Sequence, residues 1–550
     1  LLTALGVTGF EAVVEHLFRF GFEWAPAFLH AHGLPIILAF LLFPALIGLL
    51  IPLLRRLVPT DERQHAIPQV IIAMLRRDGL ITLRSFILKT FSSILTLGAG
   101  GSLGREGPVV LLGAGVGSNL GRMLRLPSSW IKTLIAGGAA AAIAAAFHAP
   151  LAGLFFGLEI ILTEFQPRAF LLVAVAAMSA AGFTGMLSQP PSYPIGPFKL
   201  ASPWALLLYL LLGVMAGLLS RVYVNVLVRG EAKGAKLPIP ASIRPALAGL
   251  AFGFLGFIAP DSLGGGYGVI DRALHGQMGA LLMLGLVLVK LVAIGLTIGG
   301  GWPGGTFAPA LYLGTMLGGA FGLFAQQLLP TVAGEPSTYT LVGMAALVAG
   351  ATHAPLTGLA LCLELTRQYG MILPAAIACG SAALISQRLS PYSVDSDHLH
   401  HEGVLMPWEV ADLRSVAIGD VMTATVHTTQ ADRTIGDLIM QMQTHRHGGY
   451  PVLDQAGRLV GMITLQDVRA LPLDGRLVVP IAQAMRQPVH TITPQRTLAD
   501  AALLMAKHKV GRLPVVDPAD AGRLLGIISR SDILTALPQD AVDGSSQLGI

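Results

Sequence analysis

Two glycine-rich segments contain the residue types best suited to binding a small ion. The first reads GGSLGREGPVV (residues 100–110) and the second GGWPGGTFAPAL (residues 300–311). Glycine permits close approach of the backbone and proline is tolerated in a first helical turn, so each segment predicts a break followed by a helix start. Free backbone N–H groups and the positive end of such a helix favour an anion. A cation site would instead use carbonyl ends and carboxylates.

Two lysines lie at matching distances from these breaks. Lys89 and Lys290 each lie 11 residues before a glycine of a break, Gly100 and Gly301, inside otherwise apolar sequence. A charge within a bilayer costs at least about 2.5 kcal/mol and is usually functional. We expect both lysines to attract anions electrostatically. The alternative is that they snorkel to the membrane interface.

The matching distances are part of an internal repeat. Lys89, Gly100, Gly104 and Pro108 recur with identical spacing 201 residues later, and HAPLAGLFFGLE (148–159) is matched by HAPLTGLALCLE (353–364). Duplicated halves with interrupted helices at corresponding positions are typical of transporters and channels, whose substrate site lies where the halves meet.

Composition places most of the chain in a membrane. Of its 550 residues 53% are hydrophobic and 12% charged, with a mean hydropathy of +0.68. Soluble domains carry about 25% charged residues, so the excess apolar surface requires a bilayer. The net charge of +5 is assigned to cytoplasmic loops rather than to nucleic-acid binding. As this assignment predicts, basic residues lie at the ends of several apolar segments: Arg55, Arg56, Arg76 and Arg77.

The motifs of the apolar part resemble those of the CLC family of chloride channels and transporters. The resemblance rests on GREGP (104–108), GGGYG (264–268), GGTFAP (304–309) and SPYS (390–393), in this order. It implies a polytopic α-helical membrane protein with the CLC fold, built from two inverted repeats with broken helices. It further implies a homodimer in which each subunit has its own anion path.

The resemblance also implies roles for individual residues. Glu106 would be the gating glutamate, which competes with the anion and takes up protons; the alternative is a structural ion pair with Arg105. The hydroxyl of Tyr392 would coordinate the inner anion, unless Tyr392 is only an interfacial anchor. The expected anion-binding residues are His65, Ala66, Ile67, Arg105, Gly107, Thr306, Phe307, Ala308 and Tyr392.

The sequence departs from the family at two important positions. His65, in the segment QHAIP (64–68), replaces the usual serine of the central site. A neutral histidine can donate one hydrogen bond and a protonated one adds positive charge, so we expect anion binding to strengthen as the pH falls. Ile160, after Glu159, replaces the internal proton glutamate of many exchangers. Water or Glu164 could substitute, and we expect Glu159 and its repeat counterpart Glu364 to be structural.

The C-terminal part contains a second repeat of ordinary soluble composition. Its copies, residues 420–468 and 483–533, each predict a strand, an amphipathic helix, two apolar strands and a closing helix. They resemble a tandem pair of α/β CBS domains, which implies an adenine nucleotide as a possible ligand. The expected nucleotide-binding residues, whose alternative role is to cap the following helices, are Thr464, Asp467, Ser529 and Asp532.

These boundaries divide the chain into five segments. We expect a transmembrane anion-transport domain over 1–390, a linker over 391–416, CBS domains over 417–478 and 479–537, and a flexible tail over 538–550. The histidines of the linker are expected to be solvated, with metal binding as the alternative: His398, His400 and His401.

The function that these features favour is transport of chloride or other small monovalent anions, linked to protons and regulated by the CBS pair. A passive chloride channel is the alternative because of Ile160, and a cation transporter is disfavoured by the lysines and glycine breaks. The sequence has no nucleophile–base pair, phosphate loop or metal-ligand cluster that would indicate an enzyme, a required cofactor or a metal. Chloride, protons, membrane lipid and a second subunit are the expected partners. We expect the protein in the plasma (inner) membrane with the CBS domains in the cytoplasm.

Overall fold

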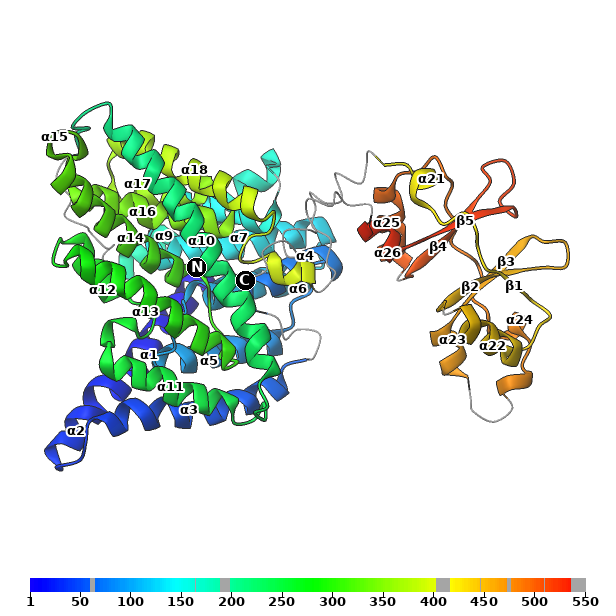
Figure 1. Cartoon of the computed structure of the whole chain (residues 1–550), viewed down its shortest axis with the longest axis horizontal. Coiled ribbons are helices and arrows are strands. Elements are labelled where there is room, and N and C mark those ends of the chain that lie inside the picture. The colour runs from blue at the N-terminus through cyan, green and yellow to red at the C-terminus, as the bar shows by residue number, and fades with distance from the viewer. Residues whose placement is uncertain are drawn as a thin grey trace. The chain divides into compact units, whose positions relative to one another are not determined.

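A computed structural model describes residues 1–59, 65–163, 165–187, 198–401, 416–445, 447–471, 476–508 and 510–535. The chain divides into two compact units, Leu1–Val404 and Leu405–Ile550 (Figure 1). The first is helical and the second combines helices and short strands, so the chain is a polytopic α-helical membrane protein with an α/β C-terminal part.

The first half of this unit contains the helices before the first glycine break and those of the first repeat. In order they are α1 (Leu2–Arg19), η1 (Phe20–Trp24), α2 (Ala25–Ala31), α3 (Ile37–Leu57), α4 (Ala66–Arg76), α5 (Leu83–Gly98), α6 (Glu106–Met123), α7 (Ser128–Phe147), α8 (Pro150–Phe156), η3 (Gly157–Leu162) and α9 (Pro167–Leu187).

The second half of the unit continues with α10 (Ala205–Lys236), α11 (Arg244–Ile258), η4 (Pro260–Ser262), α12 (Tyr267–Leu274), α13 (Ala280–Gly299), α14 (Phe307–Leu328), α15 (Pro330–Ala333), α16 (Pro336–Thr352), α17 (Pro355–Thr366), η5 (Tyr369–Met371), α18 (Ile372–Leu389) and α19 (Asp397–His401). Among the described residues, seven helices are long and apolar enough to cross a bilayer.

The sequence repeat is also a repeat of secondary structure. The order α5, α6, α7, α8 and α9 recurs as α13, α14, α16, α17 and α18. Backbone conformation follows it closely: Gly100 and Gly301 have φ of +81° and +82°, and His148 and His353 have φ of +51° and +58°. A φ near +80° is readily available only to glycine, which explains this residue at the start of both breaks.

Glycines bring the main helices of each repeat into backbone contact. A Cβ on Gly113 of α6 would lie 2.1 Å from the carbonyl oxygen of Gly138 in α7, and one on Gly314 of α14 would lie 2.4 Å from that of Gly343 in α16. Gly249 of α11 and Pro44 of α3 make a similar close approach, and these two helices lie side by side (Figure 1). Small residues at such crossings allow the van der Waals packing that holds membrane helices together.

The second unit contains the two copies of the C-terminal repeat. The first comprises α21 (Ile418–Val421), β1 (Thr429–Gln430), α22 (Ile435–His445), β2 (Gly449–Leu453), β3 (Leu459–Thr464), α23 (Leu465–Ala470) and η7 (Arg476–Val478). The second comprises α24 (Ile481–Ala484), α25 (Leu498–His508), β4 (Arg512–Val516), β5 (Leu524–Ser529) and α26 (Arg530–Thr535). Strand β2 pairs with β1 in parallel and with β3 antiparallel, and β4 pairs antiparallel with β5.

The two soluble copies exchange their first segments. Ile418 of α21 packs in the core with Leu498, Leu513 and Ile528 of the second copy. Ile481 of α24 packs in the core of the first copy. Each opening helix therefore crosses the expected division at residue 478 to complete the core of the other copy.

The segment after α18 also differs from its expected role as a linker. Residues up to Val404 group with the first unit, and Tyr392, Val394 and Asp395 are buried. The Val394 N–H donates to the carbonyl of Ala351, at 2.8 Å, which ties this segment to α16. Residues 402–415 of the expected linker and the expected tail over 538–550 lie outside the described residues.

Candidate functional site

The two glycine breaks meet at the centre of the first unit. The N–H of Gly104 donates to the carbonyl of Gly305 at 2.7 Å, and the N–H of Gly305 donates to that of Gly104 at 2.8 Å. This antiparallel bridge joins residues that are 201 positions apart in the sequence. Because α6 and α14 start just after the bridge, their positive ends lie close together.

Glu106 lies between these two helix ends. It is the first residue of α6, its side chain is fully buried, and its Oε2 accepts a hydrogen bond from the Ala308 N–H of α14 at 3.1 Å. The carboxylate thus uses a backbone donor of the kind that binds an anion. Arg105 lies 4.0 Å away and makes its closer ion pair, at 2.9 Å, with Glu11.

Tyr267 contacts Glu106 but was not among the site residues expected from the sequence. Its hydroxyl donates to Oε1 of Glu106, and the Arg105 guanidinium lies 4.3 Å from the centre of its ring. Tyr267 begins α12, directly after the GGG turn at 264–266, so its position in GGGYG was the available signal. Glu106 is therefore held on both oxygens in a sealed site.

Lys290 supports this turn. Its buried ammonium donates to the carbonyls of Ser262, at 3.0 Å, and Gly264, at 2.6 Å, just before α12. It does not extend to the protein surface, so the snorkelling alternative does not hold for Lys290. Its contacts make it a positioning residue for the turn that carries Tyr267.

Lys89 has a different environment despite its matching place in the repeat. It donates to Oε1 of Gln69 and lines a cavity together with Arg55, Ser92 and Ser93. Lys89 and Arg55 give this cavity positive charge, as an approach for anions requires.

A second cavity adjoins the breaks and shares His65 and Glu231 with the first. Three helix starts lie in its wall: Ala66 and Ile67 of α4, Gly107 of α6, and Thr306, which immediately precedes α14. Five of the expected anion-binding residues therefore line one cavity: His65, Ala66, Ile67, Gly107 and Thr306. Converging positive helix ends are suited to a small anion.

The other expected anion-binding residues do not line this cavity: Arg105, Phe307, Ala308 and Tyr392. The Phe307 ring is buried near Phe147, the Ala308 N–H is engaged by Glu106, and the Thr306 carbonyl accepts from the hydroxyl of Tyr223. The buried ring of Tyr392 stacks on His400 with centroids 4.0 Å apart, so His400 is not a free, solvated linker side chain.

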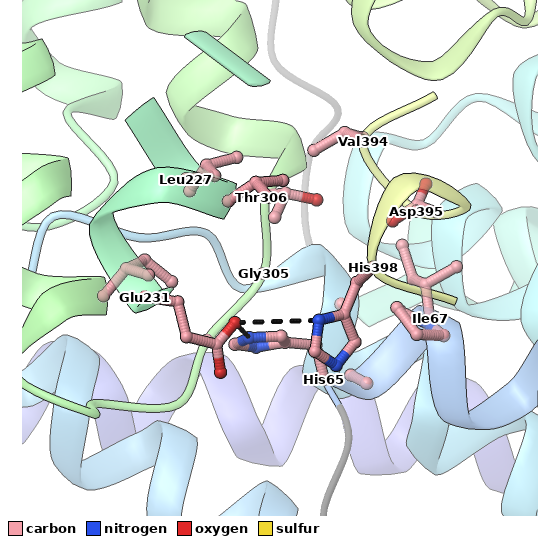
Figure 2. A pocket seen from close by; sticks show the side chains of 15 residues that line it. His65, Ile67, Leu227, Glu231, Gly305, Thr306, Val394, Asp395 and His398 are labelled. Carbon is pink, nitrogen blue, oxygen red and sulfur yellow. Dashed lines mark hydrogen bonds and ion pairs between the residues drawn. The ribbon is translucent and has the colours of Figure 1, made fainter. Parts of the chain in front are cut away.

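The environment of His65 was not foreseen. Its Nε2 lies 3.1 Å from Oε2 of Glu231, and the same oxygen lies 4.0 Å from Nδ1 of His398 (Figure 2). The carboxylate balances the charge of a protonated His65, so the expected gain in positive charge near the anion is reduced. Glu231 and Asp395 were missed because they come from distant parts of the chain. His398 was expected to be a solvated linker residue, but it lies in this cavity beside Glu231.

Glu159 and Glu364 cap helices of the opposite repeat. Glu159 accepts from the N–H groups of Leu356 and Thr357, at 3.0 and 2.7 Å, at the start of α17. Glu364 accepts from those of Leu151 and Ala152, at 2.7 and 2.8 Å, at the start of α8. This reciprocal capping supports the structural interpretation. Glu164, the possible substitute for a glutamate at 160, lies outside the described residues.

The expected nucleotide-binding residues of the soluble unit form helix caps. Thr464 and Asp467 make a capping box at α23, and the other oxygen of Asp467 lies 2.6 Å from Nε of Arg486. Asp532 likewise accepts from the N–H and hydroxyl of Ser529, both at 2.7 Å. These contacts agree with the alternative role of all four residues, which is to cap the following helices. Nowhere in the described ranges do three or more histidine, cysteine or acidic side chains gather as a metal site.

The apolar spanning helices and the converging helix starts define an integral membrane transport protein. A family model described as "Voltage gated chloride channel" matches residues 44–387, and one for the CBS domain matches residues 418–474 and 481–539. The chain belongs to the CLC family of chloride channels and transporters, and it carries two CBS domains at its C-terminal end.

Relatives and solved structures agree with this family. Proteins named H(+)/Cl(-) exchange transporter ClcA, from Salmonella paratyphi B and Salmonella newport, are 36% identical over 370 residues, which cover 64% of this chain and 77% of each relative. A slow cyanobacterial Cl-/H+ antiporter is 25% identical with a TM-score of 0.67 and covers 73% of this chain and 95% of its own. A eukaryotic CLC transporter, at 19% identity, covers 97% of this chain and 96% of its own with a TM-score of 0.68, which shows the fold.

Proposed function

We propose that this protein is an antiporter that transports chloride, or another small monovalent anion, in exchange for protons. The observation that carries the proposal is the buried Glu106 carboxylate, which accepts from the Ala308 N–H between two positive helix ends. A carboxylate in this position mimics a bound anion. Protonation removes its charge and much of its attraction to the site, so one side chain can exchange a proton for an anion.

The relatives support coupling to protons. The ClcA proteins are named as H(+)/Cl(-) exchangers, and one structural neighbour is described as a Cl-/H+ antiporter. A further neighbour, 25% identical with a TM-score of 0.58, is described as a fluoride/proton antiporter. Chloride is the substrate that we propose, with anion preference depending on the central cavity around His65.

The test is transport by the purified chain in chloride-loaded liposomes, with the voltage clamped by valinomycin. Chloride efflux is expected to drive protons uphill into the liposomes, so the external pH rises. The Glu106→Gln variant should lose the proton movement and keep chloride efflux. Glu335→Gln, which changes an exposed glutamate before α16, should behave like the wild type. Chloride efflux without proton movement in the wild type would instead establish a passive channel, with Glu106 as its gate.

The assembly and location belong to the same proposal. We propose a homodimer in the plasma (inner) membrane, with one anion path in each subunit and with the CBS domains in the cytoplasm. Mass measurement of the detergent-solubilised chain tests the dimer. Accessibility of a cysteine introduced at exposed Leu503 to a membrane-impermeant reagent, in whole and in permeabilised cells, tests the location.

The CBS pair is proposed to regulate transport by binding an adenine nucleotide. Support comes from the two CBS family matches, whereas Asp467 and Asp532 already cap their helices. Calorimetric titration of the whole chain with ATP, AMP and cyclic dinucleotides should produce heat with at least one. Absence of heat with all of them would leave the pair as a structural module.

A further inference from the structure

Four titratable side chains converge on the cavity beside the glycine breaks. His65 precedes α4, Glu231 lies in α10, Asp395 follows α18, and His398 lies in α19. The rest of the lining is apolar or backbone, apart from Thr306, so these four are the protonatable groups of this cavity within the described residues. They are separated by up to 333 residues in the sequence but share one space (Figure 2).

Three of the groups form a cluster around one carboxylate oxygen. Oε2 of Glu231 lies 3.1 Å from His65 and 4.0 Å from His398, and the imidazole centroids are 6.0 Å apart. Glu231 retains 38% exposure and the imidazoles 24% and 30%, so protons can reach the cluster from water. Each imidazole has two ring nitrogens that can donate or accept a hydrogen bond, which suits it to a relay.

Asp395 is the deepest member. Its side chain is 2% exposed, and its Oδ2 is buried without a hydrogen-bond partner in the described part of the chain. Backbone contacts hold the segment in place: Val394 donates to Ala351, and Asp395 itself donates from its N–H to Oγ of Ser393 at 3.3 Å. A buried carboxylate oxygen without a donor is costly when charged, and a proton removes this cost.

The surrounding charges distinguish the two carboxylates. Glu231 has two imidazoles beside it and shares the adjoining cavity with Arg55 and Lys89, so its negative charge is balanced. The nearby Arg221 lies 3.8 Å from Asp397, two residues beyond Asp395. His65 and His398 are the basic side chains that line the cavity with Asp395. Asp395 is thus the carboxylate better placed to exist in the neutral form.

We propose that Asp395 is the inner proton acceptor of the antiporter, supplied through the Glu231–His65–His398 cluster. The inference rests on the proposed exchange function. A charged Asp395 would repel an anion at the helix starts of Ala66, Gly107 and Thr306, whereas a protonated one admits it. The proton on Asp395 and the anion in this cavity are therefore energetically coupled, and each changes the affinity for the other by the same factor.

Glu159 is a poorer candidate for the same role. Both of its carboxylate oxygens accept hydrogen bonds at the start of α17, one of them from the hydroxyl of Thr357 at 2.7 Å as well. Position 160 is the apolar Ile160, which is 6% exposed. Protonating Glu159 would weaken a helix cap, while protonating Asp395 would remove the charge from a buried carboxylate that has an oxygen without a hydrogen-bond donor in the described part of the chain.

The experiment measures chloride and proton fluxes of the full chain in the same liposomes. Asp395→Asn is expected to keep chloride efflux and to lose proton flux by about 100-fold, the low end of what a positioned proton-transfer group contributes. Asp395→Glu should restore part of the proton flux. Asp397→Asn is the matched control, because it changes a buried aspartate that pairs with Arg221 and does not line the cavity, and it should keep the wild-type ratio.

A second variant keeps the proposal testable if Asp395→Asn fails to fold. With an inward chloride gradient, which drives protons out of the liposomes, Glu231→Gln is expected to slow proton flux at high internal pH, where the relay must collect scarce protons. Its proton flux should approach that of the wild type as the internal pH falls. A purely structural role would not produce this pH dependence. If the wild type couples protons to chloride and both Asp395→Asn and Glu231→Gln keep its proton-to-chloride ratio, this inference is overturned while the proposed antiport stands. Absence of proton coupling in the wild type would overturn the proposed antiport and this inference together.

Discussion

The two glycine breaks have nearly the same backbone and different side chains. Gly104 and Gly305 bridge each other, and proline follows four residues later in both, at 108 and 309. At the position where the first repeat has Glu106, the second has Phe307, which packs against apolar rings. The shared backbone supplies two positive helix ends, while only the first break adds a protonatable side chain between them. Duplication thus builds an anion site, and divergence of single side chains gives it chemistry.

The same comparison applies to the framework, where the repeats remain alike. The contacts of α6 with α7 and of α14 with α16 depend on glycines at matching points. Gly113→Ala and Gly314→Ala should each lower the free energy of unfolding by about 3 kcal/mol, at the upper end for overpacked sites. Retention of the monodisperse protein after heating, measured by size-exclusion chromatography, tests this.

A matched control exists in α9. Gly182→Ala should be harmless, because a Cβ there meets nothing within 4 Å. If only one of Gly113→Ala and Gly314→Ala destabilises the protein, the two repeats do not depend on the same packing.

The two lysines test where the repeats have diverged. Lys290→Met removes the donor to the carbonyls of Ser262 and Gly264, and buried groups left unsatisfied should cost about 2 kcal/mol. Lys89→Met removes the hydrogen bond to the buried Gln69 and should cost about 1 kcal/mol. Because Lys89 also lines a cavity, this variant should slow chloride flux at low chloride concentration. Thermal stability and chloride flux measured on both variants test whether the two lysines have different roles. Equal losses of stability would contradict a structural role for Lys290 alone.

The reciprocal caps should show a smaller, graded effect. Glu159→Gln and Glu364→Gln each weaken charge-assisted caps worth about 1–2 kcal/mol. Glu159→Gln should cost more because Glu159 also accepts from the hydroxyl of Thr357. In a Thr357→Val background, the costs of Glu159→Gln and Glu364→Gln should become equal. Heat stability of both glutamate variants, measured with and without Thr357→Val, gives the ranking, and a larger cost for Glu364→Gln would reverse the comparison.

The smallest effect is expected in the soluble repeat. His490 stacks on His508 with centroids 3.6 Å apart, and His427 stacks on His445 at 4.1 Å. Desolvation, followed by the charges of His490 and Lys507, holds the pKa of His508 below its usual value. The unfolded chain therefore binds the proton more readily, so the stability contributed by neutral His508 is complete above about pH 6.5 and is lost as the pH falls.

Hydrogen exchange of the intact protein tests this pH dependence. Protection of β4, relative to that in His508→Asn, should decrease on acidification from about pH 7.5 to about pH 5.5. A constant difference between wild type and variant over this range would show that the stack does not sense pH.

Sequence patterns predicted much of the fold and some of the residues that meet at the candidate site. The 201-residue repeat predicted that the breaks correspond, and Glu106 and Ala308 indeed lie in contact. Family membership and the CBS pair are confirmed by the matches over 44–387, 418–474 and 481–539. The segment around Asp395 was assigned to a linker because it is polar and short, features that do not reveal burial between helices.

The sequence by itself determined the elements and their duplication, because apolar runs, glycines with positive φ and helix-starting prolines act on the local backbone. Only the tertiary structure decided that Lys290 holds a turn while Lys89 faces a cavity, and that Glu231 meets His65 and His398. Such meetings depend on how helices far apart in the chain pack together, and local patterns carry no information about that packing.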